Sequence, residues 1–236
     1  VQYNEKNSSY DNIIADKSSF LQSVEEFGIG WRLDMPYVEI PDEKNKTNVY
    51  VYMPDGRVFK KGSTESGLEN YKLSDVKFSE CAADKDGTAS EYTLAFADGD
   101  TYFFNEKGYL QRKNDKFGNQ IEYRWSSDDV PVLNSITNNW HDVVTFEYAD
   151  GSITIRYKER KYIISRTQTD NGFLISSITD PLGRTTEFNY TEKNFKFDFF
   201  SKDERIQTGT NKYYLLNKIR YNGGLETNYE YITSKK

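Results

Sequence analysis

The chain of 236 residues has only one cysteine, Cys81, and only one histidine, His141. A single cysteine excludes an internal disulfide, and no Cys/His cluster has the spacing of a zinc site. Any Ser/His/Asp or Cys/His catalysis would have to use His141, and the G-x-S-x-G motif of hydrolases is missing as well. No apolar run approaches the ~18 residues that a helix needs to cross a bilayer. We therefore expect neither a disulfide scaffold nor a zinc protein, and no insertion of this segment into a membrane.

An excess of positive charge is also missing. The chain has 31 Lys and Arg against 37 Asp and Glu, a net charge of -6, and the two signs are interspersed. Nucleic acid is therefore not an expected partner. Carboxylates that could form a glycosidase-like pair occur at Asp98 and Asp100 and at Asp128 and Asp129, but acidic residues at turns usually serve turn geometry and solvation. We expect no catalytic activity, no cofactor, no metal and no catalytic or cofactor-binding residues.

Aromatic residues are what the chain has in abundance. They make up 16% of the sequence, with 19 Tyr and 15 Phe, a composition typical of β-structure. Residues 174–190 show the pattern most clearly, because Asp180-Pro181-Leu182-Gly183 has the residue preferences of a type I turn. After this turn the side chains alternate with period two, with Phe188 and Tyr190 on one face and Glu187 on the other. This stretch is predicted to be a β-hairpin.

The same hairpin unit recurs three more times, so the sequence predicts an all-β array of antiparallel hairpins. In each unit the second and third alternating positions after the turn are aromatic, and the positions between them are nearly all polar. One face of the sheet should therefore be apolar and the other solvated. The units span residues 110–125, 133–148, 175–190 and 216–231, with alternating exit residues Ile121/Tyr123/Trp125, Val144/Phe146/Tyr148, Thr186/Phe188/Tyr190 and Thr227/Tyr229/Tyr231.

The turn of each unit is predicted to contain one residue with positive φ. Gly118, Gly183 and Gly224 occupy this position in the first, third and fourth units, as expected for a residue without a Cβ. The second unit has His141 there, and His is one of the few other residue types enriched in this conformation. His141 is therefore predicted to serve turn geometry rather than catalysis.

Hairpins are also predicted outside the four units. Asp-Gly between two alternating runs is a strong hairpin signal, and it occurs at Asp55-Gly56, Asp98-Gly99 and Asp150-Gly151. A further alternating strand is predicted over Phe195, Phe197 and Phe199, followed by a charged and mobile loop at 201–210. The chain should thus be a meander of hairpins.

The sequence divides into a lead-in segment (1–26), an N-terminal hairpin region (27–108) and the repeat hairpins (109–236). At the end of the mostly polar lead-in, the apolar residues from Phe20 to Phe27 fit either a short helix or an extended segment. In Phe27-Gly-Ile-Gly-Trp31, two glycines before a tryptophan indicate a close backbone approach or a kink at the start of a strand.

Residues 178–190, Ile-Thr-Asp-Pro-Leu-Gly-Arg-Thr-Thr-Glu-Phe-Asn-Tyr, resemble the YD unit of the RHS/YD-repeat proteins almost throughout. Residues 108–123 are nearly as similar, and Phe27-Gly-Ile-Gly-Trp31 resembles the segment that commonly precedes the repeats. This family includes bacterial polymorphic toxins, shell components of Tc insecticidal complexes, cell-wall-associated bacterial proteins and animal teneurins. The chain departs from the pattern at Asn138 and His141, where Asp and Gly are usual, and at Tyr221, where Asp is usual.

The resemblance implies a continuous β-sheet that spirals into a hollow shell and encloses a C-terminal toxin or effector domain. It implies a structural, non-catalytic role in a protein that is secreted, exposed on the cell surface or associated with the cell wall. The expected partners are the remainder of a longer parent chain and the domain that it encloses. The Asp-Pro-Leu-Gly sequence at Asp180 lies within an ordinary repeat and is not expected to be a cleavage site.

The alternative is a cell-surface β module that binds carbohydrate or protein. Tryptophan side chains on a β surface can stack against sugars, which makes Trp31, Trp125 and Trp140 candidates. Trp125 occupies an apolar-face position of the repeat and is predicted to be part of the core. Trp140 lies in a turn beside His141, and it is the candidate for an exposed surface that contacts a cell-surface glycan.

Overall fold

The computed structural model describes residues 27–31, 33–41, 48–83, 89–128, 131–170, 172–200 and 206–231, with the backbone alone at 81–83, 89, 195–200 and 206–211. The predicted lead-in segment and its possible helix lie outside these residues, apart from Phe27. The described chain contains strands and turns and no helix, as the composition predicts. It is an all-β protein.

The strands form two antiparallel sheets in sequence order. A small sheet has the order β1-β2-β3, and a large sheet of 13 strands runs from β4 to β16 with each strand beside its neighbour in sequence. The strands are β1 (Tyr37–Glu39), β2 (Tyr50–Tyr52), β3 (Val58–Lys60), β4 (Val76–Ala83), β5 (Ala89–Phe96), β6 (Thr101–Phe104), β7 (Leu110–Asn114), β8 (Gln120–Trp125), β9 (Leu133–Asn138), β10 (Val143–Ala149), β11 (Ser152–Tyr157), β12 (Arg160–Thr169), β13 (Gly172–Thr179), β14 (Thr185–Phe200), β15 (Ile206–Arg220) and β16 (Glu226–Asn228).

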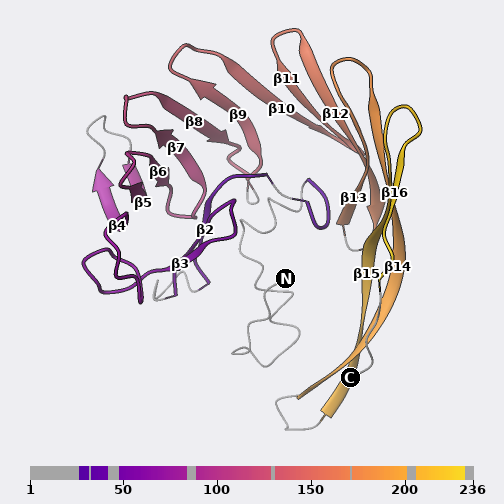
Figure 1. Cartoon of the computed structure of the whole chain (residues 1–236), viewed down its shortest axis with the longest axis horizontal. Coiled ribbons are helices and arrows are strands. Elements are labelled where there is room, and N and C mark those ends of the chain that lie inside the picture. The colour runs from indigo at the N-terminus through magenta and orange to yellow at the C-terminus, as the bar shows by residue number, and fades with distance from the viewer. Residues whose placement is uncertain are drawn as a thin grey trace.

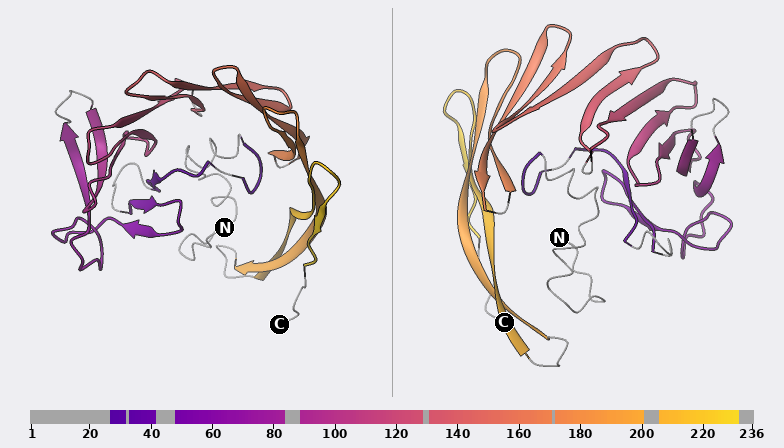
Figure 2. Two further views of the ribbon diagram at one scale, coloured as in Figure 1. Left: turned by 45° about the horizontal axis from the view of Figure 1, so that its top comes forward. Right: turned by 180° about the vertical axis from the view of Figure 1, so that it is seen from behind.

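The large sheet is an open arc whose two end strands, β4 and β16, are not paired with each other. Figures 1 and 2 show it curving around the small sheet and around the segment before β1, both of which lie inside the arc. The four predicted units are the hairpins β7-β8, β9-β10, β13-β14 and β15-β16. The predicted boundary near residue 108 falls at the turn between β6 and β7, within the continuous sheet.

The predicted turn chemistry is present. In the third unit the carboxylate Oδ1 of Asp180 accepts hydrogen bonds from the N–H groups of Leu182 (2.8 Å) and Arg184 (3.0 Å), and Gly183 N–H donates to the Asp180 carbonyl. The fourth turn residue has positive φ in every unit, at 84°, 60°, 77° and 90° for Gly118, His141, Gly183 and Gly224. The assignment of His141 to turn geometry is confirmed.

The same turn occurs once more than predicted. Asn105 begins a turn between β6 and β7 in which its Oδ1 accepts hydrogen bonds from Lys107 N–H (3.0 Å) and Tyr109 N–H (2.9 Å), and Gly108 has a φ of 85°. The sequence Asn105-Glu-Lys-Gly108 contains the turn signal, although it precedes the first of the four predicted units. The hairpins predicted at Asp55-Gly56, Asp98-Gly99 and Asp150-Gly151 are also present.

The prediction for residues 195–210 needs correction. Phe195, Phe197 and Phe199 do not form a separate strand, because β14 runs without interruption from Thr185 to Phe200. No Gly or Pro interrupts this stretch, so nothing in the sequence ends the strand between Tyr190 and Phe195. Part of the predicted loop is also strand, since β15 begins at Ile206 and pairs with β14 over its whole length. The two strands form the long hairpin that extends beyond the rest of the sheet in Figure 1.

Two main hydrophobic clusters hold the fold together. In the first, the small sheet packs its apolar side chains, among them Val38, Val51 and Phe59, against Phe78, Leu94 and Phe104 of the large sheet. In the second, the segment before β1 packs against the inner face of β8 to β15. The described N-terminal part of the chain therefore packs against the inner face of the arc that the later hairpins form.

Candidate functional site

The inner face of the large sheet is covered by the segment before β1, residues 27–31 and 33–35, which we call the strap. Phe27 is buried and lies edge-on against Phe146 and Tyr148 of β10, with 6.4 Å between ring centroids in both pairs. Phe146 is itself 8% exposed. The apolar face of the second unit is therefore closed by residues more than 100 positions earlier in the sequence.

Trp31 fixes the strap to the third unit. Its ring lies edge-on to Phe188 at 4.8 Å, and its indole N–H donates a hydrogen bond of 2.9 Å to the hydroxyl of Tyr190. Burial raises the pKa of the Tyr190 hydroxyl. A single tryptophan thus contacts the residues at both aromatic positions of this unit, and Trp31 is not an exposed sugar-stacking residue.

Gly28 explains the glycines before Trp31. Its φ is 144°, and a Cβ at this position would lie 3.0 Å from Cγ1 of Ile175. The neighbouring Ile29 N–H donates a hydrogen bond of 2.7 Å to the carbonyl of Phe173 in β13. The predicted close backbone approach is confirmed, whereas the first strand begins only at Tyr37.

The described residues cover the fourth unit only in part. Leu216 and Ile219 of β15 pack in the same cluster as the strap, whereas the two aromatic positions of the unit are exposed. Tyr229 and Tyr231 occupy its two aromatic positions and are 41% and 47% exposed. β15 pairs with β14 from Ile206 to Arg220, but its outer edge pairs with β16 only over Lys218–Arg220. Tyr229 N–H also donates to the Asn217 carbonyl, and the order of the described strands ends at β16.

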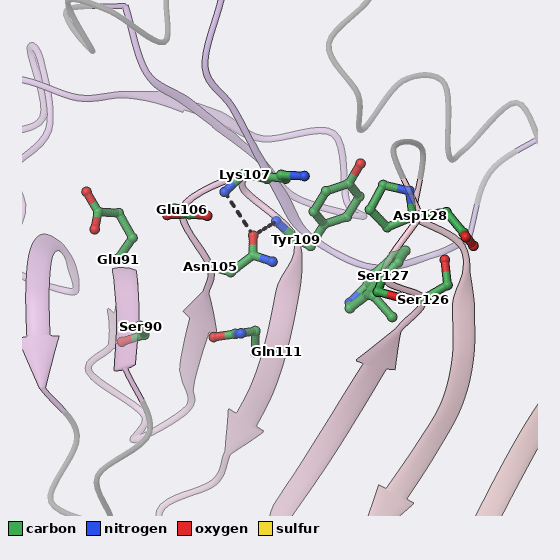
Figure 3. Close-up of a pocket in the computed structure, with 12 residues that line it drawn as sticks. Ser90, Glu91, Asn105, Glu106, Lys107, Tyr109, Gln111, Ser126, Ser127 and Asp128 are labelled. Carbon is green, nitrogen blue, oxygen red and sulfur yellow. Dashed lines mark hydrogen bonds between the residues drawn. The ribbon is translucent and has the colours of Figure 1, made fainter.

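A separate pocket of about 640 Å³ lies at the edge of the large sheet that carries the β6-β7 turn and the β8-β9 connection. Figure 3 shows Ser90 and Glu91 on one side of it, Ser126, Ser127 and Asp128 on the other, and Asn105, Tyr109 and Gln111 between them. Trp125 and Pro131 complete the lining. The volume falls within the range of typical small-ligand pockets.

The pocket contains an amide with unused hydrogen-bonding capacity. Oε1 of Gln111 is buried and has no hydrogen-bond partner among the described residues. An unsatisfied buried acceptor costs about 1–3 kcal/mol and is uncommon in native proteins. Sequence reasoning missed this pocket, because its residues come from three separate stretches of the sequence, within 90–91, 105–111 and 125–131, and no motif links them.

The other residues singled out from the sequence do not come together in a site. Trp140 is 69% exposed at the third position of its turn, as predicted, but Phe117 and Leu182 hold the same turn position and are 79% and 77% exposed. Exposure at this position is therefore a property of the turn. His141 is exposed beside Trp140.

Neither carboxylate pair forms a glycosidase-like site in the described residues. Asp98 accepts a hydrogen bond from Asp100 N–H within the turn, and Asp100 forms a 2.6 Å ion pair with Lys113. Asp128 is exposed at the pocket, while Asp129 and the Cys81 side chain lie outside the described residues. No group of three or more metal-ligating side chains occurs in the described ranges. The same ranges contain no helix that is long and apolar enough to cross a membrane.

Comparisons with known proteins give little further information. No protein-family model matches the sequence, and no curated protein matches it. Among solved structures, the fold is similar to the crystal structure of a porin-like protein from Bacteroides uniformis, with 14% sequence identity and a TM-score of 0.37 over 77% of this chain and 96% of that one. A similarity at this level carries no argument about function.

Proposed function

We propose that this chain is a structural, non-catalytic wall segment of an RHS/YD-repeat shell, whose parent protein encloses and delivers a C-terminal toxin or effector domain. The resemblance of residues 178–190 and 108–123 to the YD unit motivates the proposal. The observation that supports it most directly is the difference between the aromatic positions of the units, which are buried or half-buried at the second and third units and exposed at the fourth.

The end of the sheet formed by β15 and β16 is suited to pairing with further strands. The last strand of an open antiparallel sheet invites pairing with a further strand. Tyr229 and Tyr231, just after β16, are in the repeat positions that are packed in the earlier units. In the proposed shell, further hairpins of the parent chain pair with β15 and β16 and extend the inner wall. The parent protein is then secreted or attached to the cell surface.

Limited proteolysis of the longest natural parent chain, followed by mass spectrometry, tests this function. We expect residues 27–236 to resist digestion only as part of a larger body, together with a protected C-terminal fragment. Release of 27–236 as a free, compact and soluble core would contradict the shell and favour a self-contained binding module.

A matched pair of variants sharpens the test. If further hairpins cover the fourth unit, Tyr229→Ala should destabilise the parent chain by about 3–5 kcal/mol, as for other buried aromatic side chains. In the 236-residue chain the same substitution should change stability by about 1 kcal/mol or less, because Tyr229 is exposed there. Glu230→Ala, on the neighbouring solvated position, serves as the control in both chains. Equal effects of Tyr229→Ala in the two chains would oppose the proposed continuation.

A further inference from the structure

The pocket at the β6-β7 turn has an aromatic wall with a fixed orientation. Trp125 donates its indole N–H to the carbonyl of Leu110 at 2.8 Å, and its ring lies 4.7 Å from the ring of Tyr109, centroid to centroid. Tyr109 is completely buried and supports Trp125 from within the protein, whereas Trp125 keeps part of its surface accessible. A partly exposed, rigid indole is a suitable surface for the apolar face of a sugar ring.

Two carboxamides next to this wall have complementary capacity left for a ligand. Asn105 uses only its Oδ1 in the turn, where it accepts two backbone N–H groups, so its NH₂ group is available as a donor. Gln111 contributes the opposite function, since its buried Oε1 is an acceptor without a donor. A donor and an acceptor on neighbouring amides match a hydroxyl group, which can accept from one and donate to the other. In Figure 3 the two side chains lie one above the other on adjacent parts of the chain.

The charges around the pocket restrict the ligand further. Glu91, Glu106 and Asp128 contribute three carboxylates to the lining, and Lys107 contributes the single ammonium group. A ligand that itself carries a carboxylate, sulfate or phosphate would meet a net negative charge. The lining thus favours an uncharged ligand with several hydroxyl groups.

We propose that this pocket binds an uncharged sugar residue of a glycan, with the ring against Trp125 and its hydroxyl groups on Asn105 and Gln111. The inference goes beyond the shell function and does not depend on it, because the pocket is formed by β5 to β9 alone. It also places sugar binding at the β6-β7 turn, at the opposite end of the strands from the β9-β10 turn that carries Trp140.

Saturation-transfer difference NMR on the full 236-residue chain tests the proposal. N,N′-diacetylchitobiose and cellobiose serve as neutral probes, and 3′-sialyllactose serves as the acidic one. We expect saturable transfer to at least one neutral probe and weaker transfer to the acidic probe. No saturable transfer to either neutral probe, or tighter binding of 3′-sialyllactose, would overturn the proposal.

Substitutions locate the site without disturbing the fold. Asn105→Asp keeps the oxygen that caps the turn and replaces the free NH₂ donor, because Asp already caps the sister turns at Asp115 and Asp180. It should weaken neutral-sugar binding by about three- to tenfold, the effect of one lost hydrogen bond. Gln111→Leu should have a similar effect through the lost acceptor, with unchanged thermal unfolding as the check on folding.

Asn138→Asp is the matched control, because Asn138 caps its turn with the same two hydrogen bonds at the opposite edge of the sheet. It should leave sugar binding unchanged, and so should Trp140→Ala. Equal binding by the Asn105→Asp variant and the Asn138→Asp control would overturn the pocket assignment. Loss of binding in Trp140→Ala alone would move the sugar site to the exposed turn and would overturn it as well.

Discussion

The third and fourth hairpin units have the same sequence pattern but differ in burial. In the third unit Phe188 is 9% exposed and Tyr190 is half-buried, because Trp31 of the strap packs against the Phe188 ring and donates a hydrogen bond to the Tyr190 hydroxyl. In the fourth unit Tyr229 and Tyr231 hold the equivalent positions and are 41% and 47% exposed. The repeat decides which face of the strand is apolar, but a distant segment decides whether that face is buried.

The two units are also stabilised in different ways. The third depends on apolar packing against the strap, which belongs to the same hydrophobic cluster. In the fourth, Leu216 and Ile219 of β15 belong to that cluster as well, but residues 226–231 are held by polar contacts: Glu226 pairs with Lys218 at 3.0 Å and with Arg220 at 2.8 Å, and the hydroxyl of Tyr231 donates to the Leu216 carbonyl. Exposed ion pairs contribute little to stability, so the fourth hairpin should be the weaker of the two.

The largest effect is expected at the covered unit. Phe188→Ala should lower the free energy of unfolding by about 3–5 kcal/mol, because it removes a buried ring and leaves a cavity beneath Trp31. Tyr229→Ala should lower it by about 1 kcal/mol or less. Urea unfolding monitored by circular dichroism measures both, with Glu187→Ala on the solvated face as a nearly silent control. Similar urea midpoints for Phe188→Ala and Tyr229→Ala would abolish the distinction between the units.

The strap itself is the next test. Trp31→Ala should destabilise the chain by about 2–3 kcal/mol, less than a fully buried tryptophan would, since Trp31 is half-buried. Amide hydrogen exchange in β13 and β14 should become faster, while β15 and β16 should not change. Trp140→Ala removes the same side chain from an exposed turn and should alter stability by no more than about 0.5 kcal/mol. Unchanged exchange in β14 after loss of Trp31 would show that the strap does not protect this unit.

The smallest effect is expected from pH at the fourth unit. Hydrogen bonds from Arg220 and then Lys218 lower the pKa of Glu226 below its usual value. A carboxylate whose pKa is lowered by folding stabilises the fold above its unfolded pKa, and this stabilisation is lost as the pH falls through the folded pKa. Amide protection of Ile219 and Thr227 should therefore fall as the pH drops below the usual pKa of a glutamate side chain.

The covered hairpin provides the contrast in that experiment. A hydrogen bond from the Arg184 side chain also lowers the pKa of Asp180 in its turn, but the packing of Phe188 and Tyr190 against Trp31 involves no carboxylate. Protection in β13 and β14 should persist where protection in β16 is lost. Glu226→Gln should make β16 equally weak above and below the usual pKa of a glutamate side chain. Persistent pH dependence in this variant would assign the effect to another carboxylate.

Much of the fold was predictable because it is local. Period-two alternation, Asp-Gly dipeptides and the Asp180-Pro-Leu-Gly183 turn depend on contacts within about ten residues, and each correctly predicted a strand or a reversal. The same reasoning placed His141 at positive φ. It failed at Phe195, Phe197 and Phe199, because alternation alone does not tell where one strand ends and another begins.

The candidate sites were less predictable. Trp125 was expected in the core, and its ring does pack on Tyr109, but it also lines a pocket together with Gln111 and Asn105. These residues lie in β7, the preceding turn and the end of β8, and the β-bulges between β6 and β7 and between β8 and β9 influence how they converge. A bulge shifts the alternation by one residue and so cannot be read from a periodic pattern.

The sequence by itself determined the class of the fold, the positions of most hairpins and the apolar face of each strand, because these follow from backbone geometry and the period of a β-strand. Only the tertiary structure decided which of those faces are buried. Burial requires a partner surface, and here Phe27 and Trp31 supply it from more than 100 residues away through packing that no local pattern encodes. The tertiary structure therefore separated the covered aromatic positions of the third unit from the exposed ones of the fourth.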